Sequence, residues 1–181
     1  MSWEIGKERT QKAKLMARKV AEQVPKSLPI DLPKLIEIYR MKIYWETELL
    51  DDTEDAVTYA AGNWNIVFLN KNTHHTMCKI RWSIAHELGH VVLGHLKKCN
   101  LKSNRGLIYT LDREANIFAE ELLMPADFIF SHYSHGFEYL KIACCVSEKS
   151  LEVRLMNLGL TGIYETAASS EEYPAICLDD L

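Results

Sequence analysis

Apolar residues recur along much of the chain with the period of an α-helix, and this pattern predicts most of its secondary structure. The clearest helical stretches cover residues 7–24, 77–93 and 111–125. Asp31 is suited to cap a further helix with Pro33 in its first turn. Gly94 lies where the helix over 77–93 should end, and Pro125 should end the helix that starts near Leu111.

Three short stretches rich in β-branched and aromatic residues predict strands instead of helices. They cover residues 42–46, 56–61 and 66–69. The polar turn at 62–65 should join the last two strands as a hairpin. Strands followed by helices indicate an α+β fold, and we expect a small three-stranded antiparallel sheet packed against the helices.

Residues 137–160 hold two shorter predicted helices, the second capped by Ser147 and ended by Gly159. Their order is similar to that of a helix-turn-helix unit. A DNA-reading unit needs a basic, exposed second helix. The charges of the second helix balance instead, since they come from Glu148, Lys149, Glu152 and Arg154. We therefore expect this element to serve in packing or substrate docking.

Composition narrows the class of protein. A chain of 181 residues with 48% hydrophobic content can bury one good core. We expect one domain over 1–160, in which 1–29 form an N-terminal helix and linker and 126–160 a C-terminal helical element. Residues 161–181, with five acidic residues and no Lys or Arg, read as an acidic tail. The net charge of −4 does not favour direct binding of nucleic acid.

Two hydropathy features bear on location. No stretch approaches the ~20 continuous apolar residues of a membrane span, so we expect no membrane association. The N-terminal residues have no apolar secretory core, which predicts a cytoplasmic protein.

Residues 86–90 read His-Glu-Leu-Gly-His, the HExxH pattern, and carry the main candidate chemistry. Histidines four apart lie about 40° from each other around a helix, so His86 and His90 can bind one metal ion. Glu87 can then take a proton from a water that the ion activates. The chemistry implied is metal-assisted hydrolysis, most often of a peptide bond. The alternative, an amphipathic helix with half-buried histidines, leaves Glu87 unexplained.

A third ligand should come from elsewhere, because a catalytic zinc usually has three protein ligands and one open position. His95 is near in sequence, but on a continued helix it would lie about 180° from His86. A histidine at a helix end more often hydrogen-bonds to carbonyl groups. Asp112 and Glu114 open the second predicted helix and are better candidates, although the helix dipole alone favours acidic residues there.

The HExxH pattern, the Ala-Asn-x-Phe-Ala string over 115–119 and Leu-Leu-Met-Pro over 122–125 together resemble the ImmA/IrrE family of metallo-endopeptidases. The resemblance runs from about Ile30 to Leu160. It implies zincin-type helices and a gluzincin-like site with two histidines from the first helix and a carboxylate from the second.

The family pattern places that carboxylate four residues before the Asn of the second string, which makes Asp112 the implied metal ligand. The family usually has the longer glutamate there. Glu114 remains the alternative ligand, and it points roughly 200° away from Asp112 around the helix. Asn116 shares a helix face with Asp112 and could orient a histidine ligand through a hydrogen bond.

We therefore expect a zinc endopeptidase of restricted specificity with one metal ion, for which manganese or iron could substitute. The oxyanion needs one further donor, and the candidates are Tyr109, His132, Tyr133 and His135. The resemblance implies that the substrate is a helix-turn-helix transcriptional repressor, cut to release phage, mobile-element or stress genes. The main alternative is a metal-binding regulator that docks a repressor without cutting it. A third interpretation is a DNA binder with a structural zinc.

Overall fold

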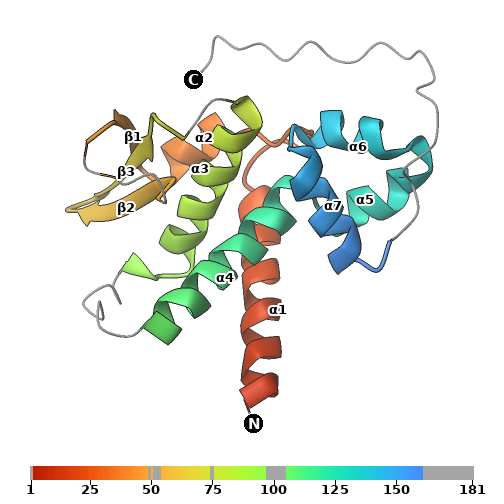
Figure 1. Ribbon diagram of the computed structural model, residues 1–181, viewed down its shortest axis with the longest axis horizontal. Coiled ribbons are helices and arrows are strands. Elements are labelled where there is room, and N and C mark those ends of the chain that lie inside the picture. The colour runs from red at the N-terminus through yellow and green to blue at the C-terminus, as the bar shows by residue number, and fades with distance from the viewer. Residues whose placement is uncertain (1, 49, 51–53, 74–75, 97–104, 161–181) are drawn as a thin grey trace.

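The computed structural model describes residues 2–48, 50, 54–73, 76–96 and 105–160, which form an α+β fold as predicted (Figure 1). The elements in chain order are α1 (Ser2–Ala21), α2 (Leu32–Ile38), β1 (Met41–Glu46), β2 (Ala56–Ala61), β3 (Trp64–Asn70), α3 (Met77–Val92), α4 (Arg105–Leu123), α5 (Ala126–His132), the 3₁₀ helix η2 (Tyr133–His135), α6 (Phe137–Cys144) and α7 (Glu148–Asn157). Across these ranges, no helix combines the length and apolar character that a membrane span requires. The expected acidic tail lies outside the described residues, and the division into domains stays a prediction.

Several helix ends lie where capping chemistry predicts them. Asp31 accepts a hydrogen bond from the backbone N–H of Lys34 at 2.9 Å at the start of α2. Ser147 caps α7 in the same way. Both predicted caps are confirmed. Gly94 and Gly159 follow the ends of α3 and α7 with φ of 73° and 72°, a left-handed conformation in which glycine is favoured because it lacks a Cβ atom.

Two helix boundaries differ from the prediction. Helix α4 begins at Arg105 and not near Leu111, so Asp112 lies within the helix and not at its first turn. The early part of α4 includes Gly106, a poor helix former, so the local pattern did not indicate this earlier start. Helix α5 was not predicted. It follows directly after Pro125, which fits the start of a helix as well as the end of the preceding one.

The sheet is mixed, and the prediction of an all-antiparallel sheet was wrong. Its strand order is β1-β3-β2, with β2 antiparallel and β1 parallel to the central strand β3. The tight turn at Gly62 forms the expected hairpin of β2 and β3. The strand order places β1 and β2 on opposite sides of β3, so that β1 and β2 do not pair. Strand β2 is consequently an edge strand, next to the helices of the candidate site.

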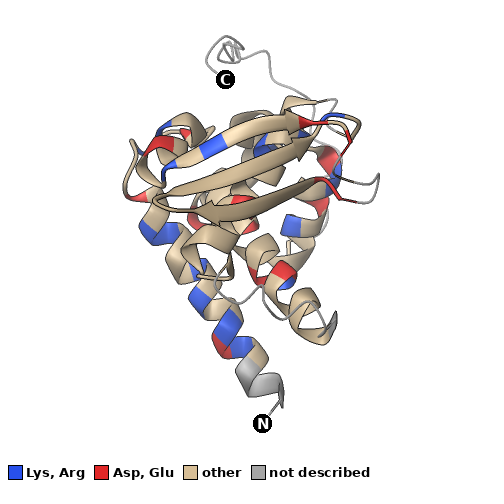
Figure 2. Cartoon of the chain, turned by 90° about the vertical axis from the view of Figure 1, so that its left-hand side faces the viewer, with Lys and Arg blue, Asp and Glu red and all other residues tan. Residues whose placement is uncertain are grey.

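The two faces of the sheet differ in burial. Val67 and Leu69 of β3 are fully buried in the core, which they share with residues of α3. Phe68 points to the opposite face, where its ring centroid lies 5.9 Å from that of Tyr44 and 6.2 Å from that of Tyr59. Figure 2 views the sheet from this outer side, and its strands carry few charged residues. Because successive side chains of a strand point to opposite faces, one face of the sheet packs against the helices of the candidate site.

Helices α3 and α4 approach each other closely at Gly89. A Cβ atom at this position would lie 3.1 Å from Phe118 Cδ1 and 3.2 Å from Ala115 Cα, tighter than about nine in ten such contacts in proteins. The missing side chain thus lets the two helix backbones come together. His90 is the next residue on α3, and Asp112 lies about one turn before Ala115 on α4. The close approach therefore brings the candidate ligands of the two helices together.

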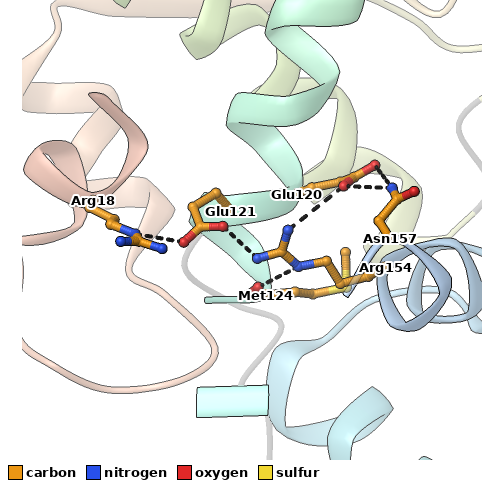
Figure 3. A network of polar contacts seen from close by, with 6 residues as sticks. All are labelled: Arg18, Glu120, Glu121, Met124, Arg154 and Asn157. Carbon is orange, nitrogen blue, oxygen red and sulfur yellow. Dashed lines mark hydrogen bonds and ion pairs between the residues drawn. The ribbon is translucent and has the colours of Figure 1, made fainter. Parts of the chain in front are cut away.

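A buried ion-pair network attaches the C-terminal helices to α4 (Figure 3). Arg154 of α7 is fully buried, and its guanidinium donates hydrogen bonds to the Glu121 carboxylate and, at 3.0 Å, to the carbonyl of Met124. Glu121 also accepts a hydrogen bond of 2.8 Å from Arg18 of α1. One carboxylate on α4 therefore joins the first and last described helices. Because Arg154 points inward, Lys149 is the exposed cation of α7, which favours the expected packing role over DNA reading.

We expect Gly89→Val to lower the free energy of unfolding by about 1–3 kcal/mol, because the new side chain must push α3 and α4 apart. Urea denaturation measures this loss. The control is Gly6→Val on α1, where an added Cβ atom meets nothing within 4 Å. The control should change stability by no more than about 0.5 kcal/mol. Equal stability of Gly89→Val and the unaltered protein would contradict the close approach.

Candidate metal centre

Helix α3 presents its two motif histidines toward Asp112 of α4. His86 Nε2 and His90 Nε2 lie 3.0 Å apart, and Asp112 Oδ1 is 3.5 Å from His90 Nε2. The ligand atoms of the three side chains all lie within 4.8 Å of one another. A tetrahedral zinc with bonds of about 2.0–2.1 Å places its ligand atoms about 3.3 Å apart. The donor set and its spacing therefore fit one metal ion.

Hydrogen bonding orients His86 toward this cluster. Its Nδ1 lies 2.9 Å from the side-chain oxygen of Asn116, which can only accept a hydrogen bond. His86 Nδ1 therefore carries the proton, and Nε2 keeps its lone pair for the cluster. This is the contact that the sequence suggested for Asn116, and it is the type of outer contact that fixes metal-binding histidines elsewhere.

His90 is oriented by a different pair of residues. Its Nδ1 lies 3.1 Å from His95 Nδ1, and His95 Nε2 lies 3.0 Å from Glu114 Oε2. Neither His95 nor Glu114 belongs to the cluster of His86, His90 and Asp112. The expectation that His95 points to the opposite side assumed a continued helix. The left-handed turn at Gly94 ends α3 instead and returns His95 to the side of His90.

Burial keeps His90 in the form that a ligand needs. Desolvation lowers its pKa to about 3, and the neighbouring His86 and His95 add to this effect. His90 is therefore a neutral imidazole at neutral pH. Only a neutral imidazole has a lone pair to offer a metal ion.

Glu87 is buried between α3 and the edge strand β2. Its side chain accepts a hydrogen bond of 2.6 Å from Thr58 Oγ1. Burial raises the pKa of Glu87 above its usual range, although His86 and the Thr58 hydrogen bond act in the opposite direction. Sequence reasoning did not identify Thr58. No local signal marks its role, because a threonine within the strand pattern of 56–61 is expected from strand propensity alone.

The cluster opens into a pocket of about 480 Å³ between β2, α3 and α4. Besides the cluster and Glu87, the residues that line it include Val57, Thr58, Trp82 and Ile108. The Asp112 side chain is half exposed, whereas that of His90 is 13% exposed. One side of the cluster is therefore accessible to a substrate, as a catalytic metal site requires.

A family comparison bears directly on this arrangement. The model of the peptidase M78 family, described as the IrrE N-terminal-like domain, matches residues 36–156, more than half of the chain. The chain belongs to this peptidase family. The match confirms the resemblance drawn from the motifs and includes the whole of α3 and α4. Among the curated proteins compared with the chain, none matches it.

In this M78-family chain, none of the four expected oxyanion donors lines the metal pocket, and Tyr109 alone of the four lines a pocket that adjoins it. Tyr109 is exposed and lines a second pocket of about 470 Å³, which shares Asp112 and Asn116 with the first. The other three candidates lie on α5 and η2 and do not line the metal pocket: His132, Tyr133 and His135. His132 and His135 both stack on the ring of Tyr139, and their own rings lie tilted to each other, a packing arrangement within the C-terminal helices.

The M78-family site distinguishes its two acidic candidates. We expect Asp112→Ala to weaken zinc binding by ~10²-fold or more, because it removes an atom of the cluster. Glu114→Ala should have a smaller effect, since Glu114 reaches the cluster only through His95. Competition with a chromogenic chelator measures both variants. Normal affinity in Asp112→Ala with a greater loss in Glu114→Ala would reverse the assignment.

Proposed function

We propose that the chain is a zinc-dependent endopeptidase of restricted specificity. His86, His90 and Asp112 are its metal ligands, and Glu87 is its general base. The observation that carries this proposal is the position of Glu87, buried next to three converging ligand atoms at the wall of an open pocket. Membership of a peptidase family supports it.

The donor set supports zinc as the ion. Two imidazole nitrogens and one carboxylate oxygen form a set typical of catalytic zinc, and manganese or iron could substitute. When bound, the ion supplies a Lewis acid that polarises the scissile carbonyl and acidifies an attacking water. The aspartate is one methylene shorter than the glutamate usual in the family. The close approach of α3 and α4 at Gly89 compensates for the shorter reach.

Glu87 and Thr58 provide the acid–base chemistry. Glu87 accepts a proton from the attacking water and delivers it to the departing amine as the peptide bond breaks. Thr58 holds one carboxylate oxygen of Glu87 at 2.6 Å, which leaves the other oxygen for the water. Of the expected oxyanion donors, Tyr109 is the one whose position supports that role, because its pocket adjoins the cluster.

The edge strand β2 supports the binding of an extended peptide. Ala56, Val57 and Thr58 line the pocket, and the edge of β2 away from β3 is not paired with another described strand. An unpaired strand edge can hydrogen-bond to the backbone of an added strand. A substrate strand added beside β2 would pass over His86, His90 and Asp112, which would hold the ion, and would bring its scissile carbonyl close to Glu87.

We further propose a helix-turn-helix transcriptional repressor as the protein substrate, on the strength of the resemblance to the ImmA/IrrE family. Such cleavage would release phage, mobile-element or stress genes from repression. The alternative function is that of a metal-binding regulator that docks the repressor without cutting it. The burial of Glu87 in the pocket wall favours cleavage, because docking alone needs no base.

The protein should bind about one equivalent of zinc, because the described residues contain one cluster of three suitable ligands. Elemental analysis of protein purified without chelator or added metal provides the measurement, followed by zinc titration of the metal-depleted protein. Failure to bind any transition metal would exclude the proposed enzyme.

Glu87→Gln should lower the rate of substrate cleavage by ~10²–10⁴-fold at unchanged zinc content, because it removes the base and keeps the size of the side chain. The assay follows a discrete fragment of a repressor encoded beside the gene, with Glu148→Gln on the exposed start of α7 as the control. The regulatory alternative predicts full derepression of a reporter gene by Glu87→Gln. Equal derepression by the variant and the unaltered protein would therefore count against peptidase function.

A further inference from the structure

We propose that His95, Glu114 and Arg9 form a positioning chain that holds His90 in its ligating orientation. The proposal rests on the proposed function, because it takes His90 as a metal ligand. It assigns a role to His95 and Glu114, which lie beside the metal cluster but do not belong to it, and to Arg9 of α1. The family match begins at residue 36, so α1 lies outside the matched region.

The direction of each hydrogen bond follows from the carboxylate at the end of the chain. An ionised Glu114 can only accept, so His95 Nε2 must donate to it across 3.0 Å. A neutral His95 then has its lone pair on Nδ1, which accepts from His90 Nδ1 across 3.1 Å. His90 thus carries its proton on Nδ1 and turns the Nε2 lone pair toward His86 and Asp112. One carboxylate fixes both the tautomer and the ring orientation of His90.

Arg9 offsets the free-energy cost of burying the Glu114 carboxylate. The Glu114 side chain is 12% exposed, and its Oε1 atom accepts no hydrogen bond within the described part of the chain. Arg9 Nε of α1 lies 3.1 Å from that atom and compensates its charge as an ion pair. A buried carboxylate without a compensating charge is costly. Helix α1 therefore provides a countercharge beside the carboxylate at the end of the chain of hydrogen bonds.

A second ion pair joins α1 to α4, and its contacts lead to α7 and not to the metal cluster. Arg18 pairs with Glu121, two helical turns beyond Glu114, and Glu121 continues to Arg154 of α7 (Figure 3). The two pairs join the same helices, so both contribute to holding α1 in place. Only the pair of Arg9 and Glu114 continues through His95 to a ligand. The difference separates positioning of His90 from simple attachment of α1.

The test compares zinc affinity and stability in matched variants of the full chain. Chelator competition gives the zinc dissociation constant of each protein, and urea denaturation of the metal-free form gives its stability. We expect His95→Leu to raise the dissociation constant by ~10–100-fold. His95→Asn should lose less, because its amide oxygen can still accept from His90. Glu114→Gln should likewise keep more affinity than Glu114→Ala.

The two arginines of α1 provide the decisive comparison. Arg9→Ala should raise the zinc dissociation constant several-fold, whereas Arg18→Ala should leave it unchanged while also lowering stability. The visible absorption spectrum of the cobalt-substituted protein should change with Arg9→Ala and not with Arg18→Ala, because it reports the geometry of the ligands.

Two results would overturn the proposal: unchanged zinc affinity in both His95 variants, or equal effects of the two arginine substitutions. If His95→Leu fails to fold, His95→Asn and Arg9→Ala carry the test. If the unaltered protein does not bind zinc, the proposed function fails together with this proposal. If it binds zinc and either of the two results above is found, only this proposal fails.

Discussion

The contact between α3 and α4 at Gly89 sets the distance on which the candidate metal centre depends. Two histidines one turn apart on a single helix can converge without help, but their partner Asp112 must come from another helix. A side chain at position 89 would meet the backbone of Ala115 and the ring of Phe118. The glycine removes this obstacle, and the short aspartate can then reach the histidines. An aspartate side chain is short, so the spacing of the two helices and the length of the candidate ligand have to agree.

Around this contact, the buried polar groups of the site are paired with one another. Asn116 holds His86, His95 holds His90, and Thr58 holds Glu87. Each of these partners comes from a different place in the sequence: a neighbouring helix, the turn after α3 and the edge strand. Pairing of this kind is required because an unsatisfied buried polar group costs free energy. It also leaves each candidate functional atom facing the pocket.

Helix α4 connects helices from the two ends of the described chain. Its carboxylates at 114 and 121 pair with arginines of α1, and the second of them also pairs with Arg154 of α7. Charged residues on α4 that would otherwise be costly to bury thus attach two further helices. The C-terminal helices are consequently linked by buried contacts to the helix that provides Asp112. This arrangement leaves α7 without the exposed basic face of a DNA-reading helix.

The sequence by itself determined the local features of this protein. The positions of the HExxH pattern, the helical periods and the caps at Asp31 and Ser147 depend on neighbouring residues, and they could be read directly. The family could also be identified, because the HExxH pattern and the Ala-Asn-x-Phe-Ala string each lie within one continuous helix. The choice between Asp112 and Glu114 still needed the family pattern, since both residues precede the same Asn within one helix.

The tertiary structure decided how distant segments meet. The strand pattern cannot show that β1 runs parallel to β3, because alternation of residues is the same in both directions. Helical periodicity placed His95 away from the site, and one left-handed turn at Gly94 reversed that position. The partners Thr58 and Arg9 carry no local signal of their roles, because those roles exist only where β2 and α1 pack beside the metal-site helices. Contacts between residues far apart in the chain, and not local propensity, therefore complete the site.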